Sequence, residues 1–192
     1  MKHPLLLSCL LLAGTGAAFS DSIFISPASQ SVSAGQSFTV GINIDNIPDV
    51  FDYQLSLAFN PHVLAAQSVT EGALFADTKD SFFSPGTIDN STGTITLVFD
   101  TLLASTVGVA GPGTLATIQF TALTIGTSSI DFSPFNDLIL EDSQGNNLTV
   151  TPISGSVAVT STPELATIYL LAPALGLIFF RYIRCKRYKM GW

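Results

Sequence analysis

The chain has 192 residues and a formal net charge of −7. Thirteen of its fourteen acidic residues lie between residues 21 and 161, where Lys79 is the only base, so this stretch carries a charge of about −12 (13 acids against one base). Such a balance excludes a nucleic-acid-binding surface, which needs a basic patch. The same stretch has no cysteine, which also excludes disulfides and cysteine-based metal sites there.

The first 20 residues have the pattern of a secretory signal peptide. A positively charged start is followed by an apolar run at residues 4–12 and then by small residues. Ala18-Phe19-Ser20 predicts cleavage before Asp21, with Ala17 as an alternative end of the peptide. A lipoprotein-type Leu-Leu-Ser-Cys sequence ends at Cys9, but Cys9 comes before the apolar region is complete, so we interpret it as part of that region.

Residues 21–161 have the period-two pattern of β-strands. Apolar side chains alternate with polar or small ones, which predicts one buried and one exposed face for each strand. The alternating runs are residues 38–44, 53–59, 95–99, 118–122, 130–132 and 157–159. Turn residues rich in Gly, Pro and Asn separate the runs, and no long amphipathic helix precedes Thr162. The pattern predicts a single all-β sandwich domain of 141 residues, large enough to bury a core.

The order of these runs resembles the cohesin family. The resemblance rests on a small-Gly-polar turn that leads into a strand (residues 32–40), a strand that ends in aromatic-Asn-Pro-x-x-Leu (residues 51–64), a Gly-x-Leu-x-x-Ile-x-Phe strand (residues 113–122) and a closing hairpin (residues 142–159). The resemblance implies a nine-stranded jelly-roll sandwich related to cellulose-binding modules, with a dockerin-bearing protein as one alternative for the partner. The family's partner-binding surface is variable, so the sequence does not locate it.

Catalytic motifs are missing from the sequence of this domain. His62 is its only histidine and follows a turn, and without cysteine the domain has neither a Cys-His pair nor a Ser-His-Asp triad. No Gly-x-Ser-x-Gly elbow or phosphate-binding glycine loop occurs. We therefore predict a non-enzymatic binding domain.

Calcium is the one cofactor that the acidic residues suggest. Asp45, Asp49 and Asp52 cluster around one strand-turn-strand junction, and a second acidic turn spans residues 142–146. Neither stretch has the spacing of an EF-hand loop, although calcium sites also draw oxygen ligands from several loops. Turn chemistry alone explains both stretches, so a calcium site at Asp45, Asp49 and Asp52 is a hypothesis beside that interpretation.

Adjacent aromatic residues suggest a carbohydrate contact. Phe82 and Phe83 stand between two serines and are the aromatic pair that we expect to be exposed, and the domain has no tryptophan. Neighbouring residues of a strand point to opposite faces, so one of the two rings is expected to face inward.

The last 31 residues have three parts. A polar motif at residues 162–167 precedes an uncharged apolar run, and a basic tail follows. Residues 165–183 would form a helix of about 28 Å, close to the thickness of the hydrocarbon core, and therefore predict a membrane span. The basic residues of the tail, expected to stay on the cytoplasmic side, are Arg181, Arg184, Lys186, Arg187 and Lys189. The alternative is a buried C-terminal helix of a soluble domain.

This arrangement resembles a PEP-CTERM sorting signal. The chain keeps Pro163, Glu164, Ala166 and Thr167 of the family's motif and has Leu165 in place of a second proline. The resemblance implies processing by an exosortase, an integral-membrane cysteine transpeptidase, in a Gram-negative bacterium that makes extracellular polysaccharide. We therefore predict an exported protein that passes through the inner membrane to the envelope, cell surface or matrix. The sandwich would act in adhesion or binding, with a carbohydrate-binding module and a cohesin-type receptor as alternatives.

Overall fold

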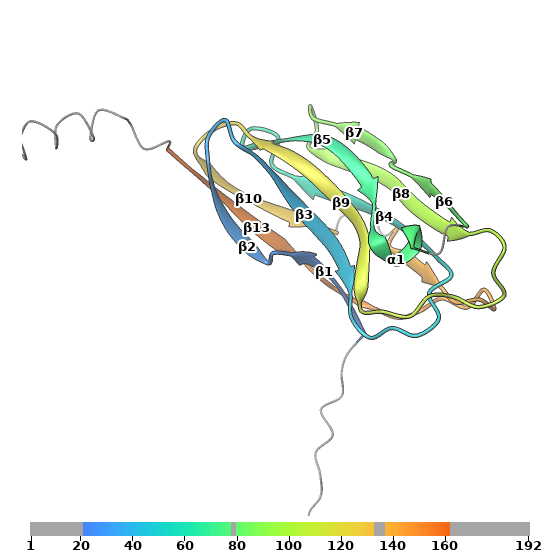
Figure 1. Cartoon of the computed structure of the whole chain (residues 1–192). Helices are drawn as coiled ribbons and strands as arrows, with labels where there is room; N and C mark the ends of the chain where they lie inside the picture. Colours follow the sequence, from blue (N-terminus) through green and yellow to red (C-terminus); the bar gives the residue numbers. More distant parts are fainter. Residues whose placement is uncertain (1–20, 78–79, 133–136, 162–192) are drawn as a thin grey trace, which may run out of the picture.

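Two β-sheets packed face to face form the body of the molecule (Figure 1). The computed structural model describes residues 21–77, 80–132 and 137–161. The expected signal peptide at residues 1–20 and the expected sorting signal at residues 162–192 lie outside the described residues and stay predictions. Within the described residues, no helix is long and apolar enough to cross a membrane.

One sheet has five strands. Its order is β12 (Thr151–Ile153), β1 (Ser22–Ser26), β3 (Ser37–Ile44), β9 (Gly113–Ala122) and β5 (Leu64–Glu71). All neighbours are antiparallel except β12 and β1, which run parallel.

The other sheet has eight strands. Its main path is β2 (Ser29–Ser33), β13 (Gly155–Thr160), β10 (Gly126–Asp131), β4 (Asp52–Phe59), β8 (Thr94–Leu102) and β6 (Ser81–Ser84). Two short strands extend it, because β11 (Ile139–Glu141) pairs with β4 and β7 (Thr87–Asp89) pairs with β8. The chain enters the sandwich at β1 and leaves it at the end of β13, on opposite ends of the molecule (Figure 1).

The core lies between the sheets and is built from the inward residues of the alternating runs. Ile42 of β3, Leu57 of β4 and Ile118 of β9 have no exposed surface. Phe120 of β9 meets Phe59 of β4 edge-on with ring centroids 5.3 Å apart, which joins the two sheets. The all-β architecture is therefore as the sequence predicts.

A single helical turn covers one end of the core. Helix α1 (Ala73–Ala76) was not expected from the sequence, because four residues are too few to show a helical period. Its Phe75 is fully buried and meets the ring of Tyr53 at 5.4 Å. The Tyr53 hydroxyl donates a hydrogen bond to the Leu115 carbonyl at 2.8 Å, which satisfies the polar end of this buried ring.

Candidate functional site

The outer side of the eight-stranded sheet carries a group of apolar side chains that we call the apolar face: Phe82, Leu97, Phe99 and Ile139. Phe82 is 55% exposed and Leu97 53%, which are large fractions for side chains of this size. Phe99 and Ile139 flank Gln54 in adjacent strands, and the Phe82 ring lies 5.8 Å from that of Phe99. The four side chains therefore cover neighbouring positions on β6, β8 and β11.

A bulge in β8 turns Leu97 outward. The pairing of β4 with β8 shifts register between Leu55 and Leu57, and Leu97 has a φ of 56°. That left-handed conformation is uncommon for a residue other than glycine. Bulges of this kind re-aim a side chain, and a strained residue next to one is a hint of function.

Neighbouring residues hold the bulge in place. The Ser56 hydroxyl accepts a hydrogen bond from the Leu97 N–H at 3.0 Å and donates one to Asp137. Gly86, with a φ of 69°, lies so close that a Cβ there would stand 2.2 Å from the Thr96 carbonyl oxygen. The outward position of Leu97 is thus fixed by a buried hydroxyl on one side and by a glycine on the other.

Two carboxylates border the apolar face. Asp52 of β4 and Glu141 of β11 are paired in register, and with Gln54, Phe99 and Ile139 they line a hollow of about 360 Å³. Burial, followed by the nearby Glu141 carboxylate, raises the pKa of Asp52. No Lys or Arg occurs among the described residues. This border therefore suits a cationic group.

Comparisons with known proteins identify the family. The family model "Cohesin domain" matches residues 23–159, more than half of the chain. The chain belongs to the cohesin family. A search of the curated proteins gives no match.

Solved cohesins have the same fold at low sequence identity. A non-cellulosomal cohesin from Archaeoglobus fulgidus is 19% identical, with a TM-score of 0.59 and coverage of 74% of this chain and 92% of that one. A type II cohesin from Acetivibrio cellulolyticus is 22% identical, with a TM-score of 0.59 and coverage of 72% and 95%. The OlpA cohesin of Clostridium thermocellum, solved in complex with a dockerin, is 14% identical, with a TM-score of 0.59 and coverage of 73% and 99%. The predicted cohesin sandwich is confirmed.

The cohesin domain separates the two phenylalanines that were predicted as one carbohydrate contact. Phe82 faces outward, whereas Phe83 pairs opposite Asp100 and packs against the core. The ring planes of Phe82 and Phe99 are tilted by 44°, so these two rings do not form a flat platform. Sugar binding at Phe82 stays a prediction, but Phe83 belongs to the interior.

The three aspartates predicted as a calcium site have separate partners. Asp45 accepts a hydrogen bond from strand β1, and Asp52 lies on the apolar face's border. Asp49 accepts bonds from the Gly108 N–H and, at 2.8 Å, from the Ser143 hydroxyl, and these bonds hold its pKa below the usual value. In the part of the chain that is described, no three His, Cys, Asp or Glu residues are grouped to hold a metal ion. The structure does not unite the three residues, and calcium binding stays a prediction.

Strand β8 differs from its predicted orientation. The alternation predicts that Ile95, Leu97 and Phe99 share one face, but only Ile95 points inward. Beyond the bulge, Val98 and Asp100 take the inward positions, and both have no exposed surface. The sequence does carry a signal of this change, because residues 97–99 are three consecutive apolar residues and so break the alternation. The predicted orientation of Leu97 and Phe99 did not take this signal into account.

Asp100 is an unusual member of the core. Neither of its carboxylate oxygens receives a hydrogen bond of standard geometry, and the Glu71 carboxyl lies beside it. Burial, and then the neighbouring Glu71, raises the pKa of Asp100 to about 7. The Ser81 hydroxyl donates to Glu71 at 2.6 Å. The cohesin domain therefore holds a protonated carboxyl in its interior at mildly acidic pH.

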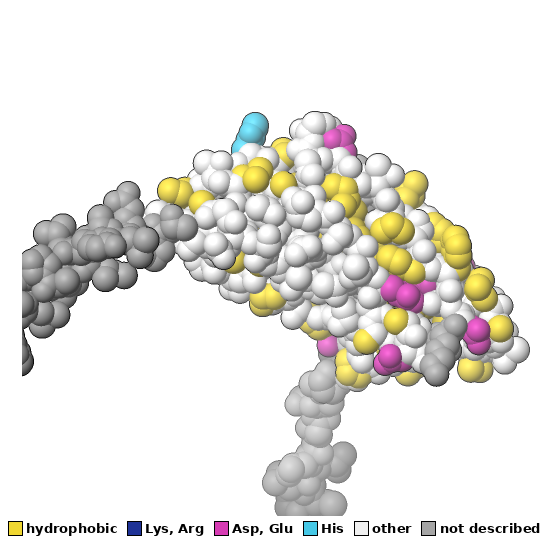
Figure 2. All heavy atoms as spheres, turned by 45° about the horizontal axis from the view of Figure 1, so that its top comes forward, with side chains coloured by type: hydrophobic (Ala, Val, Ile, Leu, Met, Phe, Trp, Pro, Cys, Tyr) yellow, Lys and Arg dark blue, Asp and Glu magenta, His cyan; other side chains and the backbone are white. Residues whose placement is uncertain are grey.

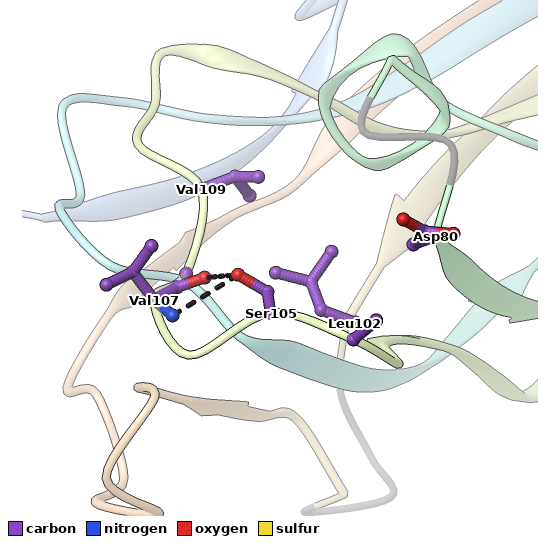
Figure 3. Close-up of a pocket in the computed structure, with 7 residues that line it drawn as sticks. Asp80, Leu102, Ser105, Val107 and Val109 are labelled. Atoms are coloured by element: carbon purple, nitrogen blue, oxygen red, sulfur yellow. Dashed lines mark hydrogen bonds between the residues drawn. The ribbon is translucent and has the colours of Figure 1, made fainter.

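A second hollow, of about 250 Å³, lies beside the loop that follows β8 (Figure 3). Leu102, Val107 and Val109 line it, and Asp80 stands at its edge. The Ser105 hydroxyl donates a hydrogen bond to the Val107 carbonyl and accepts one from the Val107 N–H, so both of its bonds go to the backbone of the loop.

Proposed function

We propose that the chain is an exported, non-enzymatic cohesin module that binds a partner protein through its apolar face. Two similar cohesins support a protein partner. The OlpA cohesin was solved with a dockerin, and so was the sixth cohesin of scaffoldin B from Acetivibrio cellulolyticus. By analogy, a dockerin-like segment is the first candidate partner for this domain.

The observation that carries the proposal is the exposed, strained Leu97. Leucine in a left-handed conformation costs roughly 1–3 kcal/mol, and its exposed apolar surface contributes nothing to the core. A polar residue or glycine would suit a solvent-facing bulge better. A partner that covers Leu97, together with Phe82 and Phe99, would bury the apolar surface of the outward leucine and so offset its conformational cost.

The border of the apolar face defines the chemistry of that partner. Asp52 and Glu141 are directly opposed like charges, an arrangement that weakens a sheet unless a cation neutralises it. A Lys or Arg on the partner, next to an apolar patch, would satisfy both carboxylates. Carbohydrate binding is less well supported, because Phe82 and Phe99 do not lie in one plane.

Binding can be tested with residues 21–161, which span the matched family model and contain the whole described core. The immobilised domain would be used to capture binding proteins from an extract of the producing organism, and the captured proteins would be identified. The segment that binds would then be purified, and its affinity for the domain would be measured by calorimetric titration. We expect 1:1 binding that Leu97→Asp abolishes and that Gln119→Glu, an exposed residue on the five-stranded sheet, leaves unchanged. Equal affinity for both variants would contradict the proposed face.

We also propose that residues 162–192 deliver the domain to the envelope. The motif Pro163-Glu164 would be recognised by an exosortase while the apolar run stays in the membrane and Arg181 and Arg184 hold its cytoplasmic side. Replacing Pro163 and Glu164 together by alanine should leave membrane insertion intact and trap the uncleaved precursor. Cell fractionation with an antibody against the domain measures both. Release at the wild-type size would mean that the motif is not a sorting site.

A further inference from the structure

The end of the sandwich from which the chain leaves carries two exposed apolar side chains. Leu123 is 46% exposed and Ile125 64%, and both lie in the turn between β9 and β10. Their exposure is not explained by the sandwich core, because the adjacent Ala122 already fills the inward position at this edge. We call the group of segments around them the exit end: residues 33–37, 60–63, 122–126 and 160–161.

Backbone hydrogen bonds fix these segments to one another. The Ala34 N–H donates to the Thr160 carbonyl at 2.9 Å, and the Gly35 N–H donates to the Ala122 carbonyl at 2.8 Å. The Leu123 N–H donates to the Val63 carbonyl at 2.8 Å. The turn with Leu123 is therefore rigidly tied to the point at which the chain leaves the domain.

The four segments of the exit end have one ionisable side chain, His62, and a carboxylate, Asp89, lies in the adjoining turn, whose Gly93 carbonyl accepts a hydrogen bond from the Phe59 N–H. The segments themselves contain no Asp, Glu, Lys or Arg, although the domain as a whole is strongly acidic. The loops at the opposite end contain Asp45, Asp49, Asp77, Asp80 and Asp142. On the face that Figure 2 shows, most acidic side chains lie toward the opposite end, and one lies at the upper edge near the histidine.

The length of the following chain restricts what the exit end can face. Leu165, where the predicted membrane span begins, is only four residue steps beyond Ser161. Fully extended, they reach about 14 Å. If residues 165–183 span a membrane, the exit end must lie near the lipid headgroups.

We infer that the exit end rests on the membrane surface, with Leu123 and Ile125 inserted at the boundary between headgroups and acyl chains. This inference rests on the proposed membrane anchor. Acidic residues would be repelled by an anionic lipid surface, and none occurs in the four segments of the exit end. Burial of the exposed Leu123 and Ile125 side chains among the lipids would be favourable, so the composition of these segments fits that location. The contact would direct the acidic end outward and hold the sorting motif between the domain and the lipid.

The test uses the chain from Asp21 to Trp192 with Cys185→Ser, reconstituted in vesicles of phosphatidylethanolamine and phosphatidylglycerol. An environment-sensitive dye is attached to Thr124→Cys, between the two apolar residues, or to Thr106→Cys, an exposed threonine near the opposite end. We expect a blue-shifted emission at position 124, with severalfold stronger quenching by spin-labelled lipid than at position 106. Adding Leu123→Ser and Ile125→Ser should remove this difference.

The outcomes separate the inference from the anchor. If the chain fails to float with the vesicles, the anchor and the inference are both wrong. If it floats and the two dyes are quenched equally, the anchor stands and the inference is wrong. A shift at position 124 that depends on protein concentration and is insensitive to the lipid quencher would show that a second copy covers this end, which also overturns the inference.

Discussion

The two outer faces of the sandwich differ although the strands beneath them have the same alternating pattern. Over β3, β9 and β5 the outward residues are polar or small, as at Thr39, Thr117 and Gln119. Over β8 and β6 they include Leu97, Phe99 and Phe82. The five-stranded sheet also has an outward apolar pair, Phe24 of β1 opposite Ile153 of β12, at one edge. The larger apolar group on the eight-stranded sheet is the one through which we propose partner binding.

Bulges occur in both sheets, so a bulge by itself does not explain the apolar face. The register of β5 against β9 shifts between Ala66 and Ser68, and the extra residue there is the exposed Gln67. The bulge in β8 exposes Leu97 instead and places it at positive φ. Two bulges with the same geometric effect thus present a polar residue on one sheet and a strained apolar one on the other.

The largest effect on stability should come from placing a charged side chain on the inner side of a strand. Leu57→Asp would place an unpaired charge in a fully buried position on β4, and we expect a loss of more than about 4 kcal/mol, enough to prevent folding. Thr39→Asp, on the exposed side of β3, should melt close to the wild type. Circular dichroism melting of residues 21–161 measures both, and a cooperative transition for Leu57→Asp would show that the assigned core is wrong.

The second effect concerns the inner side of β8, where Asp100 is buried behind the apolar face. Its pKa of about 7 lies above the value of an unfolded aspartate, so the folded state binds the additional proton. Stability should therefore fall as pH rises from about 4 to 7 and become constant above 7. Between pH 5 and 7.5 we expect a loss of about 1–3 kcal/mol, measured by denaturant unfolding.

Asp100→Asn is the matched variant for this prediction, because it keeps the shape and removes the titration. This substitution should remove most of the difference in stability between pH 5 and 7.5 and leave the smaller part that comes from Asp52, whose pKa burial also raises. The hydrogen bonds that lower the pKa of Asp49, Asp89 and Asp142 affect stability only at more acidic pH, since they keep those groups ionised. An unchanged pH dependence in Asp100→Asn would assign the effect to another group.

A smaller effect should follow from loosening the bulge while the core is left intact. Ser56→Ala removes the acceptor of the Leu97 N–H, which we expect to cost about 1–2 kcal/mol. It should also weaken partner binding more than this loss of stability explains, because Leu97 would no longer be held outward. Ser37→Ala, an exposed hydroxyl at the start of β3, is the control. Unchanged binding in a destabilised Ser56→Ala would mean that the bulge serves only the fold.

The fold and the exposure of Phe82 could be predicted from the sequence, whereas the rest of the apolar face could not. Period-two runs and turn residues define strands locally, and most inward positions, such as Ile42 and Leu57, follow from them. The orientation of Leu97 depends on a register shift against β4 and on a hydrogen bond to Ser56, which lies 41 residues away. Likewise, Asp45 and Asp49 are close in sequence, yet Asp45 accepts a hydrogen bond from Ser22 and Asp49 accepts bonds from Gly108 and Ser143. Such contacts between distant parts of the chain do not follow from the local pattern.

The smallest change in stability should come from the side chain that best distinguishes the two outer faces. Phe82 is 55% exposed on the edge strand β6, so Phe82→Ser should alter the free energy of unfolding by no more than about 0.5 kcal/mol. The adjacent Phe83→Ser removes a ring that packs against the core and should cost about 2–4 kcal/mol, which makes the pair an internal control. If the apolar face binds a protein, Phe82→Ser should nevertheless lower the affinity of the partner severalfold, because a ring covered in the complex is lost. Denaturant unfolding and calorimetric titration of the same preparations give both quantities. A variant that neither loses affinity nor changes in stability would place Phe82 outside the contact and reduce the binding face to Leu97, Phe99 and Ile139.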